Sequence, residues 1–135
     1  MGGARGNVPI RSLRLSVLEE RLAVCRPDPG SETPAWALAA PYFSVTRTAD
    51  ELSVVCSEHD VPPEVLCERG WRALKLEGPF EFGKMDMLPS VAVPLAEREV
   101  SILAIATYDT DYAFVQESQL NLAGRALRER GREIR

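Results

Sequence analysis

The segment "SILAIATYDTDY" (residues 101–112) joins an apolar run to a short acidic turn. The run 100–107 is apolar or small throughout, which is typical of a central strand covered on both faces. Tyr108-Asp109-Thr110-Asp111 has turn composition, because Asp side chains hydrogen-bond to their own backbone. Alternation resumes in "DYAFVQE" (111–117). The pattern predicts two antiparallel strands around a tight turn.

The rest of the second half predicts one more strand and two helices. "WRALKLEG" (71–78) alternates apolar and polar residues, as a strand does. The apolar spacing in 81–99 predicts a helix with Asp86 as its cap, and we expect Pro94 to kink that helix or to end its regular hydrogen bonding. Residues 118–131 predict a final helix.

The first half is predicted to be a shorter version of the second. Residues 42–58 indicate a strand, a polar turn and a strand, and residues 13–27 indicate a hairpin that turns at Glu19-Glu20-Arg21. A gapless shift of 60 residues places Ser44-Val45-Thr46 on Ala104-Ile105-Ala106. This repeat predicts an α+β fold of tandem ferredoxin-like modules, each an antiparallel sheet with helices on one face.

The predicted organisation has four segments. A flexible arm (1–11) precedes a first module (12–60), a proline-containing connector (61–70) and a second module (71–135).

Charge and composition exclude several classes of partner. The net charge is −4 and the sequence pI is about 5.1, whereas nucleic-acid binding requires a basic surface. No apolar run is long enough for a membrane span, and the N-terminus lacks the apolar region of a signal peptide. Three cysteines without CxxC spacing favour free thiols in the cytoplasm.

The strand 100–107 also predicts an assembly. Ile102, Ala104 and Ala106 lie on one face, and Leu103 and Ile105 on the other. Helices cover only one face of such a sheet, so we expect a second sheet or a second subunit on the other. A two-fold homodimer is the simplest arrangement.

Asp109 and Asp111 have two interpretations. Their carboxylates could accept charge-assisted hydrogen bonds from an ammonium group, or they could simply form the turn. No other acid has the spacing that would support a metal site.

No catalytic group is predicted. His59 is the only histidine, and no neighbouring residue is indicated as a nucleophile for it. No glycine-rich phosphate loop follows a strand. We therefore expect no enzyme activity, no cofactor and no metal.

The segments "FSVTRTADELSVVC" and "PLAEREVSILAIATYDTDYAFV" resemble the ACT-domain proteins of the CASTOR type, which include the cytosolic arginine sensors of animals. The resemblance covers roughly residues 13–130. It implies a pair of ACT modules per chain, pairing of sheets side by side, and an amino acid bound between modules without chemistry on it. The animal sensors carry four modules in one chain, so this chain would complete its site as a dimer.

The resemblance also implies site residues. One module would contribute Ser101 and Ile102 after its helix, and the other Thr107, Tyr108 and Asp111 around its turn. The helix start would contribute Glu81, Lys84 and an apolar lining residue, Met87. An acidic residue of the family corresponds to Lys84, so a neutral or acidic amino acid is expected over a cationic one.

Two functions of different classes remain open at this stage. The first is a cytoplasmic regulatory module that senses an amino acid or a similar small metabolite. The second is a ligand-free interaction module whose sheet docks a protein partner, which a pairing of Lys84 with Asp111 would favour.

Overall fold

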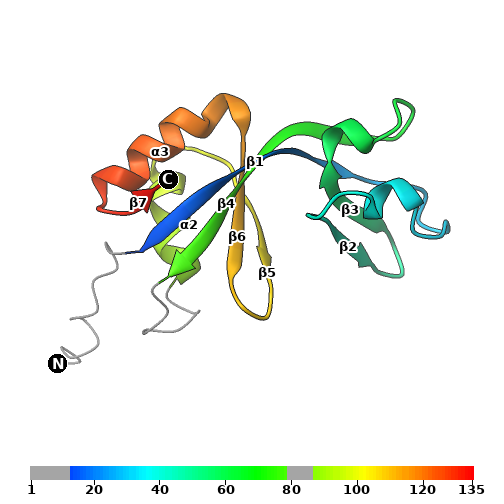
Figure 1. The fold of residues 1–135 in the computed structure, drawn as a ribbon, viewed down its shortest axis with the longest axis horizontal. Helices are drawn as coiled ribbons and strands as arrows, with labels where there is room; N and C mark the ends of the chain where they lie inside the picture. Colours follow the sequence, from blue (N-terminus) through cyan, green and yellow to red (C-terminus); the bar gives the residue numbers. More distant parts are fainter. Residues whose placement is uncertain (1–12, 79–86) are drawn as a thin grey trace. The chain divides into compact units, whose positions relative to one another are not determined.

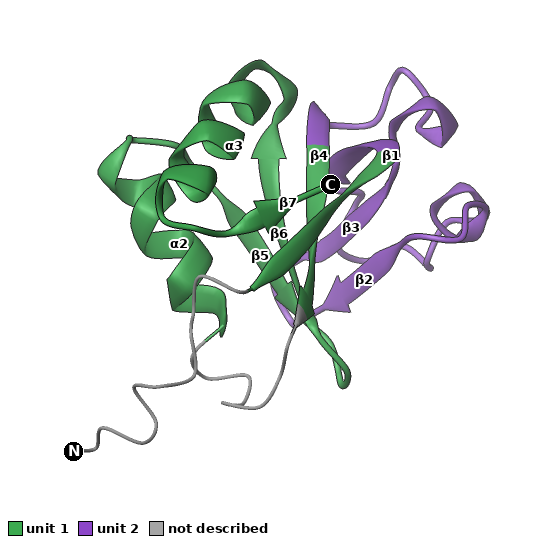
Figure 2. Ribbon diagram, turned by 60° about the vertical axis from the view of Figure 1, so that its left-hand side comes forward, with its two compact units in different colours: residues 1–19, 72–135 green, residues 20–71 purple. Residues whose placement is uncertain are grey.

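The computed structural model describes residues 13–78 and 87–135, and the chain divides into two compact units (Figure 2). Unit 1 comprises residues 1–19 and 72–135, and unit 2 comprises residues 20–71. The strands β1 (Arg14–Cys25) and β4 (Cys67–Gly78) each contribute one part to each unit. The predicted limits 1–11, 12–60, 61–70 and 71–135 stay a prediction.

Unit 1 has the ferredoxin-like order of elements along the chain. In its sheet, β1 occupies the position beside β4 that the last strand of a ferredoxin-like fold normally takes. Its chain runs from β4 through the two α-helices and the hairpin between them to β7. The strands lie in the order β1-β4-β6-β5, with β7 parallel to β1. Both helices lie on one face (Figure 1). The elements not yet bounded are α2 (Met87–Glu97), β5 (Leu103–Ala106), β6 (Asp111–Gln116), η5 (Glu117–Gln119), α3 (Leu120–Glu129) and β7 (Glu133–Ile134).

The α+β class, with antiparallel strands and helices on one face, is confirmed in unit 1. Alternate residues of β1, β4 and β6 point toward the helices and form one apolar core with them. The fully buried members include Leu15, Leu76, Val91, Val115 and Leu127.

Unit 2 carries no α-helix among its residues, all of which the structure describes. Its strands β2 (Ser44–Arg47) and β3 (Leu52–Ser57) continue the order β2-β3-β1, and β4 flanks β1 on the other side. Two short 3-10 helices, η2 (Ala35–Leu38) and η3 (Glu58–Asp60), connect the strands. A separate core contains Leu52, Val54 and Cys56.

The internal repeat is real, but its register is 59 residues and not 60. Strands β2 and β5 both have four residues and begin at Ser44 and Leu103, and β3 and β6 both have six and begin at Leu52 and Asp111. Both pairs are antiparallel hairpins. A slip of one residue moves every side chain to the other face, so the 60-residue alignment paired inward residues with outward ones.

The predicted hairpin at residues 13–27 is wrong. Arg14–Cys25 is one continuous strand, and Glu19-Glu20-Arg21 lies within it. That tripeptide contains no Gly, Pro or Asn to set the backbone of a tight turn. Its charges instead lie where the strand passes from one unit to the other.

The strand predicted to be central is an edge strand. β5 ends the order of strands in unit 1, Leu103 is 39% exposed, and Ala104 and Ala106 are exposed. An apolar sequence alone does not distinguish burial within a chain from burial between chains.

Pro94 lies inside α2, which continues to Glu97. The predicted Asp86 cap lies outside the described residues. A proline cannot donate to the carbonyl four residues earlier, here that of Ser90. The Nε of Arg132 donates to this carbonyl at 3.0 Å. Burial lowers the pKa of Arg132, and so does the neighbouring Arg130 charge.

We expect Arg132→Ala to lower the free energy of unfolding by about 1–3 kcal/mol, because it leaves a buried carbonyl without a donor. Arg130→Ala is the matched control, since Arg130 pairs with Glu97 at the surface, where ion pairs contribute ~0–1 kcal/mol. Urea unfolding of both variants measures the difference. Equal losses would contradict this role of Arg132.

Candidate functional site

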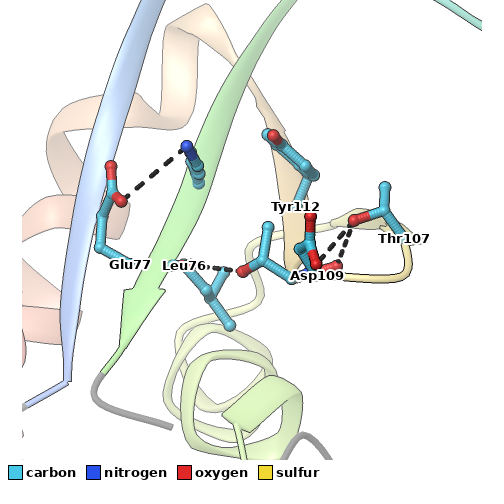
Figure 3. Close-up of a pocket in the computed structure, with 7 residues that line it drawn as sticks. Leu76, Glu77, Thr107, Asp109 and Tyr112 are labelled. Carbon is cyan, nitrogen blue, oxygen red and sulfur yellow. Dashed lines mark hydrogen bonds and ion pairs between the residues drawn. The ribbon is translucent and has the colours of Figure 1, made fainter.

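A threonine side chain closes the turn between β5 and β6. The N–H and hydroxyl of Thr107 both donate to the carbonyl of Thr110, at 2.8 and 2.9 Å, and the N–H of Thr110 donates back to the Thr107 hydroxyl at 3.1 Å (Figure 3). The Thr110 hydroxyl donates to the carbonyl of Leu76 on β4. Thr48 closes the β2–β3 turn with the same kind of contacts to Asp50 and Glu51. Part of the acidic turn is therefore turn chemistry that both hairpins share.

Asp111 is the residue that the shared turn chemistry does not explain. It is the first residue of β6, faces Ala106 across the hairpin and is 5% exposed. The equivalent first residue of β3 is Leu52, which is 0% exposed in the core of unit 2. Among the described residues, Asp111 has no ion-pair partner. A carboxylate thus occupies a position that the repeat fills with leucine.

Ser101 and Ile102 follow a strained helix end. The N–H of Val100 donates to Leu95 at 2.9 Å and that of Glu99 to Ala96 at 3.0 Å, which is a Schellman motif with Glu99 at its left-handed position, φ 60°. Helix α3 ends in the same way, but with Gly131 there, φ 80°. A positive φ has a higher conformational energy for glutamate than for glycine. Backbone strain of this kind occurs preferentially at binding sites.

The described hydrogen bonds leave the backbone N–H groups of Ser101 and Ile102 unused. The Ser101 side chain is exposed, and Ile102 packs partly against the core. Two unbonded N–H groups and a hydroxyl in sequence are suitable donors for a carboxylate.

The structure does not bring Ser101 and Asp111 together within one chain. Asp111 faces Ala106, which is five residues from Ser101 along an extended segment. At about 3.3 Å per residue the separation is roughly 16 Å, which is too far for one amino acid to span. Ser101 and Ile102 lie at one end of β5, and Thr107, Tyr108 and Asp111 at the other.

The remaining predicted site residues differ in their exposure. Tyr108 is 97% exposed at the tip of the turn, and Met87 is 0% exposed in the core of unit 1. Glu81 and Lys84 lie outside the described residues. The assignment of all these residues to a ligand site stays a prediction.

An open pocket of about 280 Å³ lies beside the same turn (Figure 3). Lys75, Glu77, Asp109 and Tyr112 line it, together with Leu76, Thr107 and Thr110. Lys75 and Glu77 alternate with core residues of β4, so they point to the face that lacks helices. The Lys75 ammonium lies 3.9 Å from Glu77, which also accepts from the Ser16 hydroxyl at 2.5 Å. The turn therefore has Asp111 on one face of the sheet and this polar pocket on the other. The sequence did not predict the pocket.

His59 has a serine neighbour that the sequence analysis missed. Its Nδ1 lies 3.1 Å from the Ser57 hydroxyl, and its Nε2 lies 3.7 Å from Asp60. Ser57 is 1% exposed, so its oxygen is closed to a substrate, whereas the His59 side chain is 78% exposed. The arrangement lacks an accessible nucleophile.

The part of the chain that the structure describes lacks both a metal-binding cluster and a membrane-spanning helix. No group of three or more His, Cys, Asp or Glu side chains is arranged to hold a metal ion. No helix there is long and apolar enough to cross a membrane.

Two sequence families match consecutive parts of the chain. An ACT-domain family matches residues 66–129, and a family described as an N-terminal domain matches residues 20–64. The cytosolic arginine sensor for mTORC1, subunit 1, of Bos taurus is 30% identical over 92 residues, and that of Homo sapiens 29% over 92 residues. The match covers 60% of this chain but only 28% of those relatives.

Solved structures share the fold over most of the chain. Protein Atu0741 of Agrobacterium tumefaciens has a TM-score of 0.87 and 31% identity over 92% of both chains. The regulatory subunit of aspartate kinase from Thermus thermophilus has a TM-score of 0.58 and 13% identity, covering 84% of this chain and 96% of that one; this likeness concerns the fold alone. With an ACT family over its second half and a relative matched over nearly its whole length, the chain belongs to the ACT-domain proteins of the CASTOR type.

Proposed function

We propose that this protein is a regulatory module that binds a free amino acid, or a similar small metabolite, at a seam between ACT modules of two copies. The animal relatives are named as cytosolic arginine sensors. By analogy with them, the protein acts in the cytoplasm and binds its ligand without converting it.

The observation that carries this proposal is the buried carboxylate of Asp111. Asp111 is 5% exposed and forms no ion pair with a described residue, although the repeat places a fully buried leucine, Leu52, at the equivalent position. A ligand ammonium group would supply an opposite charge for this carboxylate. This favours a ligand site over the interpretation in which the turn is only a turn.

A second copy would complete the site. In the β5–β6 hairpin, Thr107 and Thr110 form a hydrogen-bonded pair, and such pairs alternate along a ladder. The N–H groups of Ala104 and Ala106 therefore point to the free edge, and so does that of Ile102 by continued alternation. An uncharged, exposed edge with unused donors is a template for pairing with another strand.

Antiparallel pairing of β5 with its own copy would bring together two half-sites. One half-site is Ser101 and Ile102 of one copy, and the other is Asp111 of the partner subunit. With the two-fold axis at Ala104, Ile102 lies opposite Ala106 of the partner subunit, and Ser101 lies beside the partner's Thr107. Asp111 of the partner subunit faces that same Ala106 across its own hairpin. Each dimer would have two equivalent sites, since the operation is symmetric.

The chemistry of the half-sites indicates the class of ligand. The carboxylate of Asp111 would receive the ammonium group, and the Ser101 hydroxyl would donate to the ligand carboxylate. The family resemblance also assigns Lys84 to the ligand site, at a position where the family has an acidic residue. We therefore propose a neutral or acidic amino acid.

Thermal-shift measurements against the twenty amino acids test this function. A ligand that binds only the native state adds RT ln(1 + [L]/Kd) to its stability, ~2.7 kcal/mol at a hundredfold excess over Kd. We expect a concentration-dependent rise in melting temperature with a neutral or acidic amino acid, and a dimer by light scattering.

A dimer that shows no shift with any amino acid would favour the alternative, a ligand-free module that docks a protein partner. A protein that is monomeric at tens of micromolar would contradict the proposal that two copies form the site.

A further inference from the structure

All three cysteines of the chain come together in unit 2, although they are far apart in the sequence. Cys25 ends β1, Cys56 lies on β3 and Cys67 begins β4, and β1 lies between the other two strands. Cys25 and Cys56 belong to the core of unit 2, and Cys67 packs against it. All three are free thiols.

Cys25 and Cys67 face each other directly. The N–H of Arg26 donates to the carbonyl of Leu66 at 2.9 Å, so residues 26 and 66 form a hydrogen-bonded pair between antiparallel strands. The adjacent pair, Cys25 and Cys67, is then a pair without backbone hydrogen bonds. Such pairs have Cα atoms about 4.5 Å apart, which lies within the range of about 4.4–6.8 Å that disulfides occupy.

Cys56 is less well placed for a bond to Cys25. The ladder pairs Cys25 with Val54, and Cys56 with Ala23. Cys25 and Cys56 are therefore diagonal neighbours, which lie about 7–8 Å apart and beyond the usual disulfide range. The strand register therefore favours Cys67 over Cys56 as the disulfide partner of Cys25.

Exposure sets the order in which an oxidant reaches these thiols. Cys25 and Cys56 are each 1% exposed, whereas Cys67 is partly exposed. Burial raises the pKa of Cys25 to about 12, with contributions from the charges of Cys56 and Cys67 and from hydrogen bonds to their thiols. Cys25 is therefore a poor first nucleophile, but it is in contact with the thiol that an oxidant reaches first.

We infer that Cys25 and Cys67 form a reversible cross-strand disulfide when the protein meets a peroxide. The Cys67 thiolate attacks one oxygen of hydrogen peroxide, the O–O bond breaks, and hydroxide leaves, which gives a sulfenic acid. The Cys25 sulfur then attacks the Cys67 sulfur, the S–O bond breaks, and water leaves with the Cys25 proton. In sum, two thiols lose two electrons and two protons, and one peroxide becomes two waters.

The bond would tie β1 to β4 at the end of the sheet of unit 2. It closes a loop that contains β2, β3 and both short 3-10 helices, so it restricts the unfolded chain over most of that unit. We expect the oxidised full-length protein to melt at least about 5 °C higher than the reduced one. A reductant should reverse the shift.

Peroxide treatment of the full-length protein, followed by alkylation and mass spectrometry, tests the inference. Wild type and Cys56→Ser should each lose two hydrogen atoms and yield a peptide that joins Cys25 to Cys67. Cys67→Ser should form no disulfide. Cys25→Ala should accumulate a sulfenic acid at Cys67 that dimedone traps.

Cys67 is partly exposed, so Cys67→Ser should fold and keep the test valid even if Cys25→Ala does not. A joined Cys25–Cys56 peptide in wild type would overturn the inference. So would over-oxidation at Cys67 without loss of the Cys25 thiol.

Discussion

Replacing Asp111 with leucine is expected to abolish amino-acid binding and, at the same time, to raise the melting temperature of the free protein. The repeat supplies the reason, because Leu52 fills the equivalent position in unit 2 without exposure. Removing a charged partner from a buried site costs ~2–5 kcal/mol of binding free energy, a loss of affinity of about thirtyfold or more. Exchanging a buried carboxylate for leucine removes a desolvation cost and adds apolar burial.

Calorimetric titration with the amino acid that shifts wild type, together with a melting curve without ligand, measures both effects. Asp109→Asn is the matched control. Asp109 lies in the same turn but is exposed and lines the pocket on the other face, so its loss should leave affinity and stability nearly unchanged. If Asp111→Leu retains wild-type affinity, the carboxylate has no part in binding. If instead it lowers the melting temperature, the charge is satisfied in the free protein.

Local pattern was sufficient for much of the fold of unit 1. The strand after the acidic turn, the helix that ends before Ser101 and the final helix all have apolar periods that match their burial. The two hairpins were also recognisable as copies. Their register was one residue off, because small apolar residues on both faces of β5 fit either alignment.

The errors have a common cause, which is that sequence pattern does not specify strand neighbours. Arg14–Cys25 reads as two short strands because its apolar residues flank a charged tripeptide, yet it is one strand that contributes to both units. The polarity of Leu103–Ala106 does not reveal that β5 is an edge. The sequence was enough to nominate candidate site residues on both sides of β5, but it did not predict their separation along that strand.

The contacts missed in unit 2 are of the same kind. Cys25 and Cys67 are 42 positions apart, and only the pairing of β1 with β4 brings them opposite each other. Ser57 lies next to His59 because the chain turns into η3 directly after β3. Neither contact leaves a spacing signal in the sequence.

Two variants that each fail to bind should recover binding when they are mixed. The first variant, Asp111→Asn, loses the group for the ammonium. The second, Ser101→Asp, places a like charge beside the ligand carboxylate. In a mixed dimer one seam combines the intact Ser101 of the first chain with the intact Asp111 of the second, and the other seam carries both changes.

If subunits exchange freely, half of the dimers are mixed and each has one intact site, so about a quarter of all sites should bind with wild-type affinity. Titration of the amino acid into the equilibrated mixture measures this fraction. The rescue requires the β5 edge, so Ala104→Pro in both chains should prevent it: this change removes an N–H that points away from β6 and leaves the hairpin bonds intact. A site built within one chain predicts no recovery on mixing, because each chain would keep its own defect. Recovery that survives Ala104→Pro would place the interface elsewhere, since a second copy would then supply the missing half without pairing through β5.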